Sequence, residues 1–191
     1  MKALILASGS PRRRELLTRA GIPFEVFSCD VDETCSLPAA ETVCELSRRK
    51  ALAAATSCPG RYVLAADTLV ALDGVKMGKP LDQDQAVDML RRLSGQTHQV
   101  FTGVSLYIPS GDCLTAFDRT DVTFSAVSDT EIMDYVRSGE PMDKAGAYAI
   151  QGKAGLWIRS ISGSDTSVIG LPLYLVRELL IRGGAAELLN H

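Results

Sequence analysis

The order of strand-like and helix-like segments is the feature of this sequence that most restricts its fold. In the first half, short apolar or alternating segments typical of β-strands take turns with segments whose apolar residues recur at helical spacing. Two long alternating segments follow, separated by a short turn, and these favour antiparallel pairing. We therefore expect an α/β fold with a mixed sheet, as a single domain over residues 1–191 with room for two lobes around a cleft.

Local signals predict where these segments begin and end. Asp73-Gly74 favours a type I′ turn, so residues 61–77 should form a long strand that turns into a hairpin. Asp82 should cap one helix, and Ser128 begins the Ser-x-x-Glu capping box of another. The strands are expected at Lys2–Ala7, 24–29, 61–77, 98–108, 113–125 and 155–162, and the helices at Arg12–Ala20, Glu41–Thr56, Pro80–Leu93, 128–139 and 171–184.

The composition argues against several classes of protein. Lys and Arg number 20 against 23 Asp and Glu, a net charge of −3, so positive charge that binds an anion must be local. No stretch approaches the roughly 18 apolar residues of a membrane span, and the N-terminal apolar core is too short for a signal peptide. We expect a cytoplasmic protein with neither nucleic acid nor membrane as a partner. The five cysteines contain no CxxC, which favours reduced thiols, and Ser-His-Asp catalysis would depend on His98 alone.

The first loop and helix carry positive charge where a helix ordinarily prefers negative charge. Residues 8–11 (Ser-Gly-Ser-Pro) join the first strand to the first helix, a layout that points backbone N–H groups at an anion. Arg12–Arg14 follow directly, against the preference of the helix dipole. A bound phosphate would remove this conflict, because guanidinium groups match phosphate geometry. A solvated arginine run at a frayed helix end is the alternative.

Two cations are expected on the inward faces of helices. Arg13 precedes, at helical spacing, three apolar residues that end at Ala20. Lys50 lies on the apolar stripe of its helix, whereas Arg48 and Arg49 should face solvent. An inward Lys needs a carboxylate or phosphate partner, because isolated buried charge is costly. A lysine that snorkels at the edge of the stripe is the alternative.

Asp67 is the one charged residue in a strand that is otherwise apolar apart from Thr68. A buried carboxylate costs several kcal/mol unless it is paired or binds a metal, which makes Asp67 a functional candidate. An Asp that caps a nearby turn is the structural alternative. Glu33 in VDET, Lys79 in GKP and Gln151 between two turns are weaker candidates taken singly.

Together these residues suit phosphoryl chemistry rather than nucleophilic catalysis. Such chemistry needs mainly positioning and neutralisation of charge, with Mg²⁺ bound through oxygen atoms and a water molecule activated. No GxxxxGK[ST] motif is present, so this is not a P-loop protein. The cations in question are Arg12, Arg13, Lys50 and Lys79, and the carboxylates are Glu33 and Asp67.

The sequence resembles the Maf-type nucleoside triphosphate pyrophosphatases from residue 3 to about residue 182. The motifs that carry the resemblance are LASGSPRR (6–13), VDE (31–33), RKA (49–51), ADT (66–68), GKP (78–80), SGQTHQVFTGV (94–104), SGEPMDKAGAYAIQG (138–152) and GLPL (170–173). The resemblance implies an elongated mixed sheet flanked by helices, with two lobes around a central cleft as in Maf and ITPase proteins, often in a homodimer. It also implies hydrolysis of a nucleoside triphosphate to the monophosphate and pyrophosphate with a divalent metal, Mg²⁺ or Mn²⁺.

The resemblance also assigns roles to residues. Asp67 would be the proton acceptor that activates water, with Lys79 as a second catalytic residue. Glu33 and Asp67 would bind the metal. The substrate-binding residues would be Ser8, Arg12, Arg13, Lys50, Thr68 and Gln151.

Three positions resemble the members that act on dTTP and UTP. These are Arg12, Thr68 and Gln151, in SGSPRR, ADT and IQG, whereas members acting on 7-methyl-GTP carry SDQ and SEG in place of the last two motifs. The alternatives are a 7-methyl-GTP or deaminated-purine pyrophosphatase, or a regulator of septum formation that acts by binding. Asp165 and Lys76 depart from residues usual in the family, which puts loop order and dimer contacts in doubt but leaves the core set intact.

Overall fold

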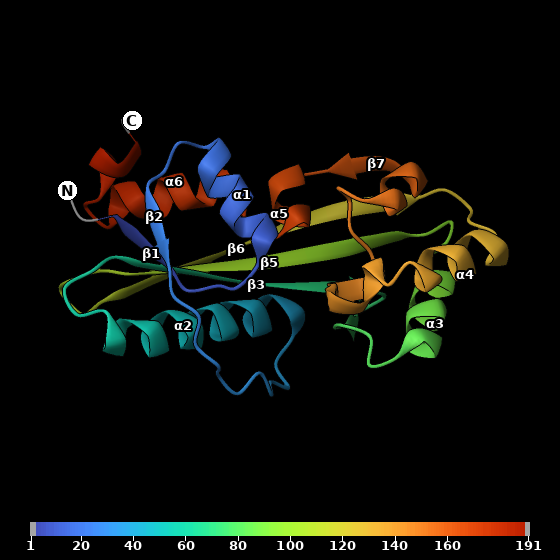
Figure 1. Ribbon diagram of the computed structural model, residues 1–191, viewed down its shortest axis with the longest axis horizontal. Helices are drawn as coiled ribbons and strands as arrows, with labels where there is room; N and C mark the ends of the chain where they lie inside the picture. Colours follow the sequence, from blue (N-terminus) through green and yellow to red (C-terminus); the bar gives the residue numbers. More distant parts are fainter. Residues whose placement is uncertain (1–2, 190–191) are drawn as a thin grey trace. The chain divides into compact units, whose positions relative to one another are not determined.

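A seven-stranded mixed sheet with helices on its faces forms the framework of residues 3–189, the part of the chain that the computed structural model describes (Figure 1). The sheet runs in the order β2-β1-β3-β5-β6-β7, and β4 pairs with β3. This confirms the predicted α/β class. None of the helices within residues 3–189 is long and apolar enough to cross a bilayer.

The elements follow the expected order. The strands are β1 (Leu4–Leu6), β2 (Phe24–Val26), β3 (Val63–Leu72), β4 (Val75–Met77), β5 (Thr97–Tyr107), β6 (Cys113–Phe124) and β7 (Ile158–Ser162). The α-helices are α1 (Pro11–Arg19), α2 (Ala39–Ser57), α3 (Gln83–Leu93), α4 (Asp129–Arg137), α5 (Asp165–Ile169) and α6 (Leu173–Arg182). Short 3₁₀ turns are η1 (Glu140–Asp143), η2 (Ala145–Ala147), η3 (Lys153–Trp157) and η4 (Ala186–Leu189).

The chain divides into two compact units. The first contains the chain up to Asp67, then Thr102–Asp118, and the chain from Gly170 onward. The second contains Thr68–Phe101 and Arg119–Ile169. A single domain over residues 1–191, with a cleft between two lobes, stays a prediction.

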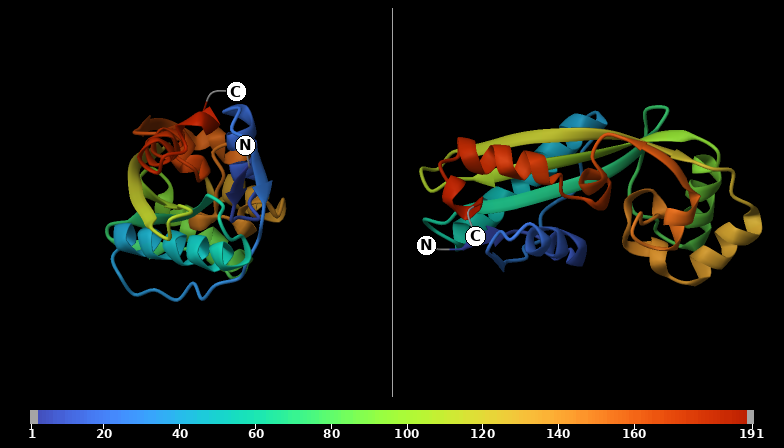
Figure 2. Two further views of the ribbon diagram at one scale, coloured as in Figure 1. Left: turned by 90° about the vertical axis from the view of Figure 1, so that its left-hand side faces the viewer. Right: turned by 90° about the horizontal axis from the view of Figure 1, so that it is seen from above.

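Parallel strands organise the first unit. β1 pairs in parallel with β2 and with β3, and Leu6 lies opposite Leu64. The connection through α1 crosses the sheet in one direction and the connection through α2 crosses back, so right-handed crossovers place the two helices on opposite faces. Figures 1 and 2 show α2 on one face of this part of the sheet, with α1 and α6 on the other.

Small residues let α2 pack closely in the first unit. Its inner face presents Ala51, Ala54 and Ala55 to Ile5 and Val63 in one buried cluster. Nearer the start of α2, a Cβ placed on Gly103 of β5 would lie 2.2 Å from the carbonyl oxygen of Val43. No side chain larger than hydrogen fits there without a shift of backbone.

The second unit has an aromatic core of its own. Phe124 contacts His98, Tyr148 and Trp157 edge-on, at ring-centroid distances of 5.0, 4.9 and 6.2 Å. His98 is 0% exposed, and its Nε2 lies 2.8 Å from the hydroxyl oxygen of Tyr148. Ala86, Leu90 and Leu93 of α3 join this core.

The locally encoded features are confirmed. Asp73 and Gly74 adopt positive φ angles of 50° and 78° in the β3–β4 hairpin. The Asp82 side chain accepts a hydrogen bond from the backbone of Gln85, and the capping box at Ser128 is complete.

Several predicted boundaries were wrong. β2 ends at Val26 rather than residue 29, because its partner β1 ends at Leu6. Residues 155–157 form a 3₁₀ turn, so β7 begins only at Ile158. Ala20 is exposed, because α1 ends at Arg19. Lys2, expected in the first strand, lies outside the described residues.

Candidate active site

The loop between β1 and α1 leads directly into the arginine-rich start of α1. Ser10 is the N-cap residue with φ −65° and ψ 119°, and its side chain makes no capping hydrogen bond among residues 3–189. Pro11 occupies the first turn, and that turn contains no acidic side chain in the described chain. A helix that begins in this way, after a short Ser-Gly-Ser loop, is typical of anion-binding helix starts.

Arg13 folds back onto this loop. Its Nη1 donates to Ser8 Oγ at 3.0 Å, and its Nε donates to the carbonyl oxygen of Gly170 at 2.8 Å. Ser8 Oγ also accepts a hydrogen bond from the backbone N–H of Ser10 at 3.2 Å. The Arg13 side chain thus joins the loop after β1 to Gly170, three residues before α6 begins, and it points inward as its helical position predicts.

Burial and neighbouring charges act on Arg13 in opposite directions. Desolvation lowers the pKa of Arg13, the carboxylates of Asp67 and then Glu33 oppose that decrease, and the charge of Arg12 adds to it. The ordinary pKa of an arginine side chain is so high that the guanidinium stays protonated at neutral pH even after this decrease. The site therefore presents a partly desolvated positive charge that acts at short range on the two candidate carboxylates.

Lys50 of α2 reaches both of these carboxylates. Its Nζ donates to Asp67 Oδ1 at 2.7 Å and lies 2.7 Å from Glu33 Oε1. The side chains of Lys50 and Asp67 are only 15% and 13% exposed, whereas Glu33 is 55% exposed. The expectation that an inward lysine needs an anionic partner is confirmed, and two carboxylates supply it.

The sheet explains why these residues meet. β1, β2 and β3 are parallel, so the segments after their carboxyl ends approach one another at one edge. β3 continues past the end of β1, and Asp67 lies three residues beyond Leu64, roughly 10 Å along the strand. Asp67 is thereby carried toward the loop that holds Ser8, while the chain after β2 brings Glu33.

Arg49 was expected to face solvent, and its side chain is 34% exposed, but it also holds the chain around Glu33. Its Nη1 donates to the carbonyl oxygens of Asp32 and Thr34 at 3.0 and 3.1 Å, and its Nε donates to Glu45 Oε1 at 2.8 Å. These two carbonyls flank Glu33 in the chain, so Arg49 fixes the backbone on both sides of that carboxylate. The sequence also did not predict that the Gly170 carbonyl would accept a hydrogen bond from Arg13. Arg49 and Gly170 nevertheless lie in the family motifs RKA and GLPL.

Three predicted site residues belong to the second unit. Thr68 follows Asp67 directly in β3, and the side chains of Lys79 and Gln151 are exposed. Beside Lys79, the Gly146 N–H donates to the Gly78 carbonyl at 3.0 Å, and across the turn that contains Gln151 the Gly152 N–H donates to the Ala149 carbonyl at 3.1 Å. The part that these three residues take in the site stays a prediction.

His98 has a structural environment. It is buried in the core of the second unit, and burial lowers its pKa from 6.5 to about 4. An imidazole that is neutral and enclosed in this way is poorly placed to exchange protons with a substrate.

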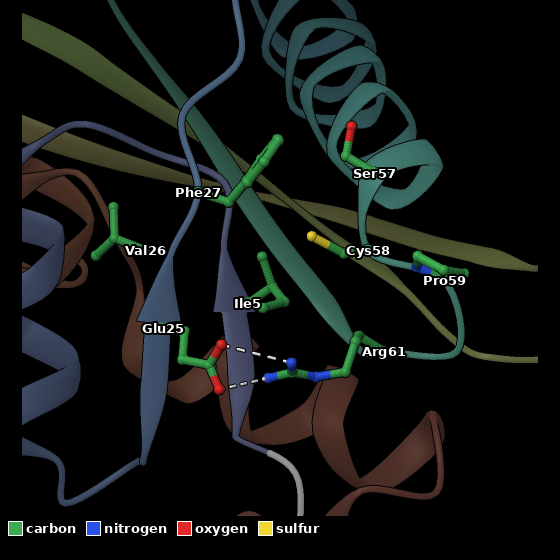
Figure 3. Close-up of a pocket in the computed structure, with 8 residues that line it drawn as sticks. All are labelled: Ile5, Glu25, Val26, Phe27, Ser57, Cys58, Pro59 and Arg61. Atoms are coloured by element: carbon green, nitrogen blue, oxygen red, sulfur yellow. Dashed lines mark hydrogen bonds and ion pairs between the residues drawn. The ribbon is translucent and has the colours of Figure 1, made fainter.

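The first unit also contains an open cavity of about 300 Å³, next to the end of α2 (Figure 3). Arg61 and Glu25 form an ion pair on its wall, with Nη2 and Oε1 3.0 Å apart. Its lining does not include any of the residues predicted for the site. Within residues 3–189, no group of three or more His, Cys, Asp or Glu side chains is arranged to hold a metal ion.

Comparison with known proteins assigns the family. Residues 3–182 match the family described as Maf-like protein. The chain belongs to the Maf family. This Maf protein is 51% identical to a dTTP/UTP pyrophosphatase of Myxococcus xanthus over 183 residues, which cover 95% of this chain and 92% of the relative. It is 50% identical to a dTTP/UTP pyrophosphatase of Symbiobacterium thermophilum, with 96% and 95% of the two chains covered.

Solved structures with a similar fold include two Ham1 proteins. The Staphylococcus aureus Ham1 protein is 17% identical with a TM-score of 0.55, covering 95% of this chain and 99% of that one. A HAM1 protein from Coxiella burnetii is 14% identical with a TM-score of 0.54, covering 95% and 100%. At these identities the likeness shows the fold alone.

Proposed function

We propose that this Maf protein hydrolyses dTTP and UTP to the nucleoside monophosphate and pyrophosphate. The curated relatives at about half identity over nearly the whole chain bear that name. The observation that carries the proposal is the cluster of Lys50, Asp67 and Glu33, in the same unit as the Ser8–Arg13 loop. Cations for a triphosphate and a carboxylate for water are thereby gathered in one unit.

The chain's own groups would divide the work between binding and proton transfer. The N–H groups at the start of α1, together with Ser8, Arg12 and Arg13, would hold the phosphates through charge-assisted hydrogen bonds. Asp67 would accept a proton from the water that attacks the phosphoanhydride. In the ligand-free protein, the ammonium of Lys50 holds the Asp67 carboxylate at 2.7 Å.

The carboxylate pair fits a divalent cation. Mg²⁺ is typically bound by one or two carboxylates together with substrate phosphates. Glu33 and Asp67 already point oxygens at a single cationic atom, Lys50 Nζ, which is the arrangement such an ion needs. When bound, Mg²⁺ or Mn²⁺ would neutralise charge on the phosphates. Lys79 of the second unit would add a further cation.

The base specificity rests on Arg12, Thr68 and Gln151. A neutral amide such as that of Gln151 can pair with the uracil or thymine edge through one donor and one acceptor. The resemblance to the family also supports a homodimer located in the cytoplasm, with oligomeric state measurable by light scattering.

A nucleotide panel tests the function. Purified protein with Mg²⁺ or Mn²⁺ is incubated with dTTP, UTP, 7-methyl-GTP and ITP, and the products are identified by chromatography. We expect dTTP and UTP to yield monophosphate and pyrophosphate fastest. Asp67→Asn should lower the rate at least 100-fold, whereas Asp88→Asn, a change at a side chain that is 76% exposed on α3, should not. A preference for 7-methyl-GTP or ITP, or full activity of Asp67→Asn, would contradict the proposal.

A further inference from the structure

Lys50 lies where a bound cation would lie. Its Nζ is 2.7 Å from an oxygen of Asp67 and 2.7 Å from an oxygen of Glu33, so one ammonium bridges the two carboxylates. Bonds of this kind between ammonium and carboxylate are short and strong. Lys50 and Asp67 are mostly buried, which reduces the screening of their attraction by water.

A divalent ion that bridged the same two oxygens would compete with Lys50 for one position. Mg²⁺ draws oxygen ligands to about 2.0–2.1 Å, so it would occupy nearly the position of the ammonium. Two cations that close repel strongly at the low effective dielectric of a partly buried site. A divalent ion that binds between these two oxygens therefore displaces Lys50.

Phosphates held at the loop after β1 would offer the ammonium a second anionic partner. In this loop Ser8 and Arg13 are bonded together, in the same unit as Lys50 and at a helix start of the kind that binds phosphate. A lysine carries three donors on a flexible stem and can turn from carboxylates to phosphate oxygens. The anion that draws Lys50 away would then be the nucleotide itself.

We propose that Lys50 closes the Glu33–Asp67 pair to metal until the phosphates of the nucleotide take over its ammonium. The inference rests on the proposed function and deepens it: metal and nucleotide would load together, and each would raise the affinity of the other by the same factor. Lys50 acts here as a positioning residue whose charge sets the order of loading.

Titration of ligand-free protein with Mn²⁺ alone, followed by the electron paramagnetic resonance signal of free Mn²⁺, tests this. Lys50→Gln keeps hydrogen-bond donors toward the carboxylates but removes the charge, and Lys50→Met removes both. We expect both variants to bind one Mn²⁺ at least tenfold more tightly than the unmodified protein. Lys50→Gln/Asp67→Asn should lose that gain, which locates the ion. If neither single variant binds Mn²⁺ more tightly, the inference is overturned.

Arg48→Met is the matched control. Arg48 is on the same helix, its side chain is 52% exposed, and its nearest carboxylate partner is Glu45 at 3.8 Å. It should leave Mn²⁺ affinity within about twofold, since the charge that it removes is exposed and screened. A gain equal to that of Lys50→Gln would mean that net charge, rather than competition at the pair, controls the affinity, and would overturn the inference.

A non-hydrolysable UTP analogue with an α,β-imido bridge tests the coupling. For each protein, the affinity for the analogue is measured with and without Mn²⁺, and the ratio of the two is taken. This ratio should be at least fivefold larger for the unmodified protein than for Lys50→Gln, because only the unmodified protein has an ammonium that must move. Equal ratios would overturn the proposed order of loading. The Mn²⁺ titration contains no nucleotide, so failure of dTTP and UTP hydrolysis would remove the proposed function without changing that result.

Discussion

His98 should make this protein lose stability in mild acid. Its imidazole is 0% exposed on β5, accepts or donates one hydrogen bond with the Tyr148 hydroxyl at 2.8 Å, and packs edge-on against Phe124. Burial lowers the pKa of His98 from 6.5 to about 4. The negative charge of Asp121 opposes that decrease, but its effect is smaller. The unfolded chain would therefore take up a proton at a higher pH than the folded chain.

The sign and size follow from this difference. Because the folded pKa is below the unfolded one, the stability contributed by neutral His98 is complete above about pH 6.5 and is lost as the pH falls toward 4. The whole shift is equivalent to roughly 3 kcal/mol in the free energy of unfolding, of which about 2 kcal/mol is lost by pH 5.

Urea denaturation at pH 7.5 and pH 5.0 measures the effect. His191→Asn removes the only other histidine of the sequence and serves as the parent. Between the two pH values the parent should lose about 2 kcal/mol more than the same protein carrying His98→Gln, in which an uncharged amide replaces the titrating ring. An equal loss in the two proteins would refute the assignment of this pH dependence to His98.

Further predictions concern close packing and the site. Gly103→Ala should lower the free energy of unfolding by about 3 kcal/mol or more, because its Cβ would lie 2.2 Å from a backbone carbonyl of α2. Gly78→Ala is the control, because a Cβ there meets nothing within 4 Å. Thermal denaturation compares the two variants, and equal melting temperatures would contradict the close packing at Gly103. Arg49→Gln should raise the Mn²⁺ concentration needed for half-maximal activity at least fivefold with a smaller change in kcat, and Arg49→Lys should not restore it, since one ammonium cannot span three acceptors. Arg13→Lys should raise the KM for dTTP about tenfold, because a lysine cannot hold the contacts made by Nε and Nη1 together; an unchanged KM would remove Arg13 from phosphate binding.

Much of the fold could be predicted because the signals are local. The hairpin at Asp73-Gly74, the Asp82 cap and the Ser128 capping box each depend on residues within about four positions of one another. The exact ends of the strands could not be predicted in this way. β2, for example, stops at Val26 because its partner β1 ends at Leu6. Where a strand ends depends on where its pairing partner ends, and that in turn is set by the tertiary structure.

The candidate site divides in the same way. Helical and strand spacing indicates by itself that Arg13, Lys50 and Asp67 are charged residues on inward faces, and the cost of buried charge requires that they have partners. The parallel pairing of the strands decides which partners they have. It brings Glu33 and Asp67 to one ammonium, although these two residues are 34 positions apart in the sequence. The Arg13–Gly170 contact spans 157 positions, and no periodicity in a single chain encodes a pairing over that distance.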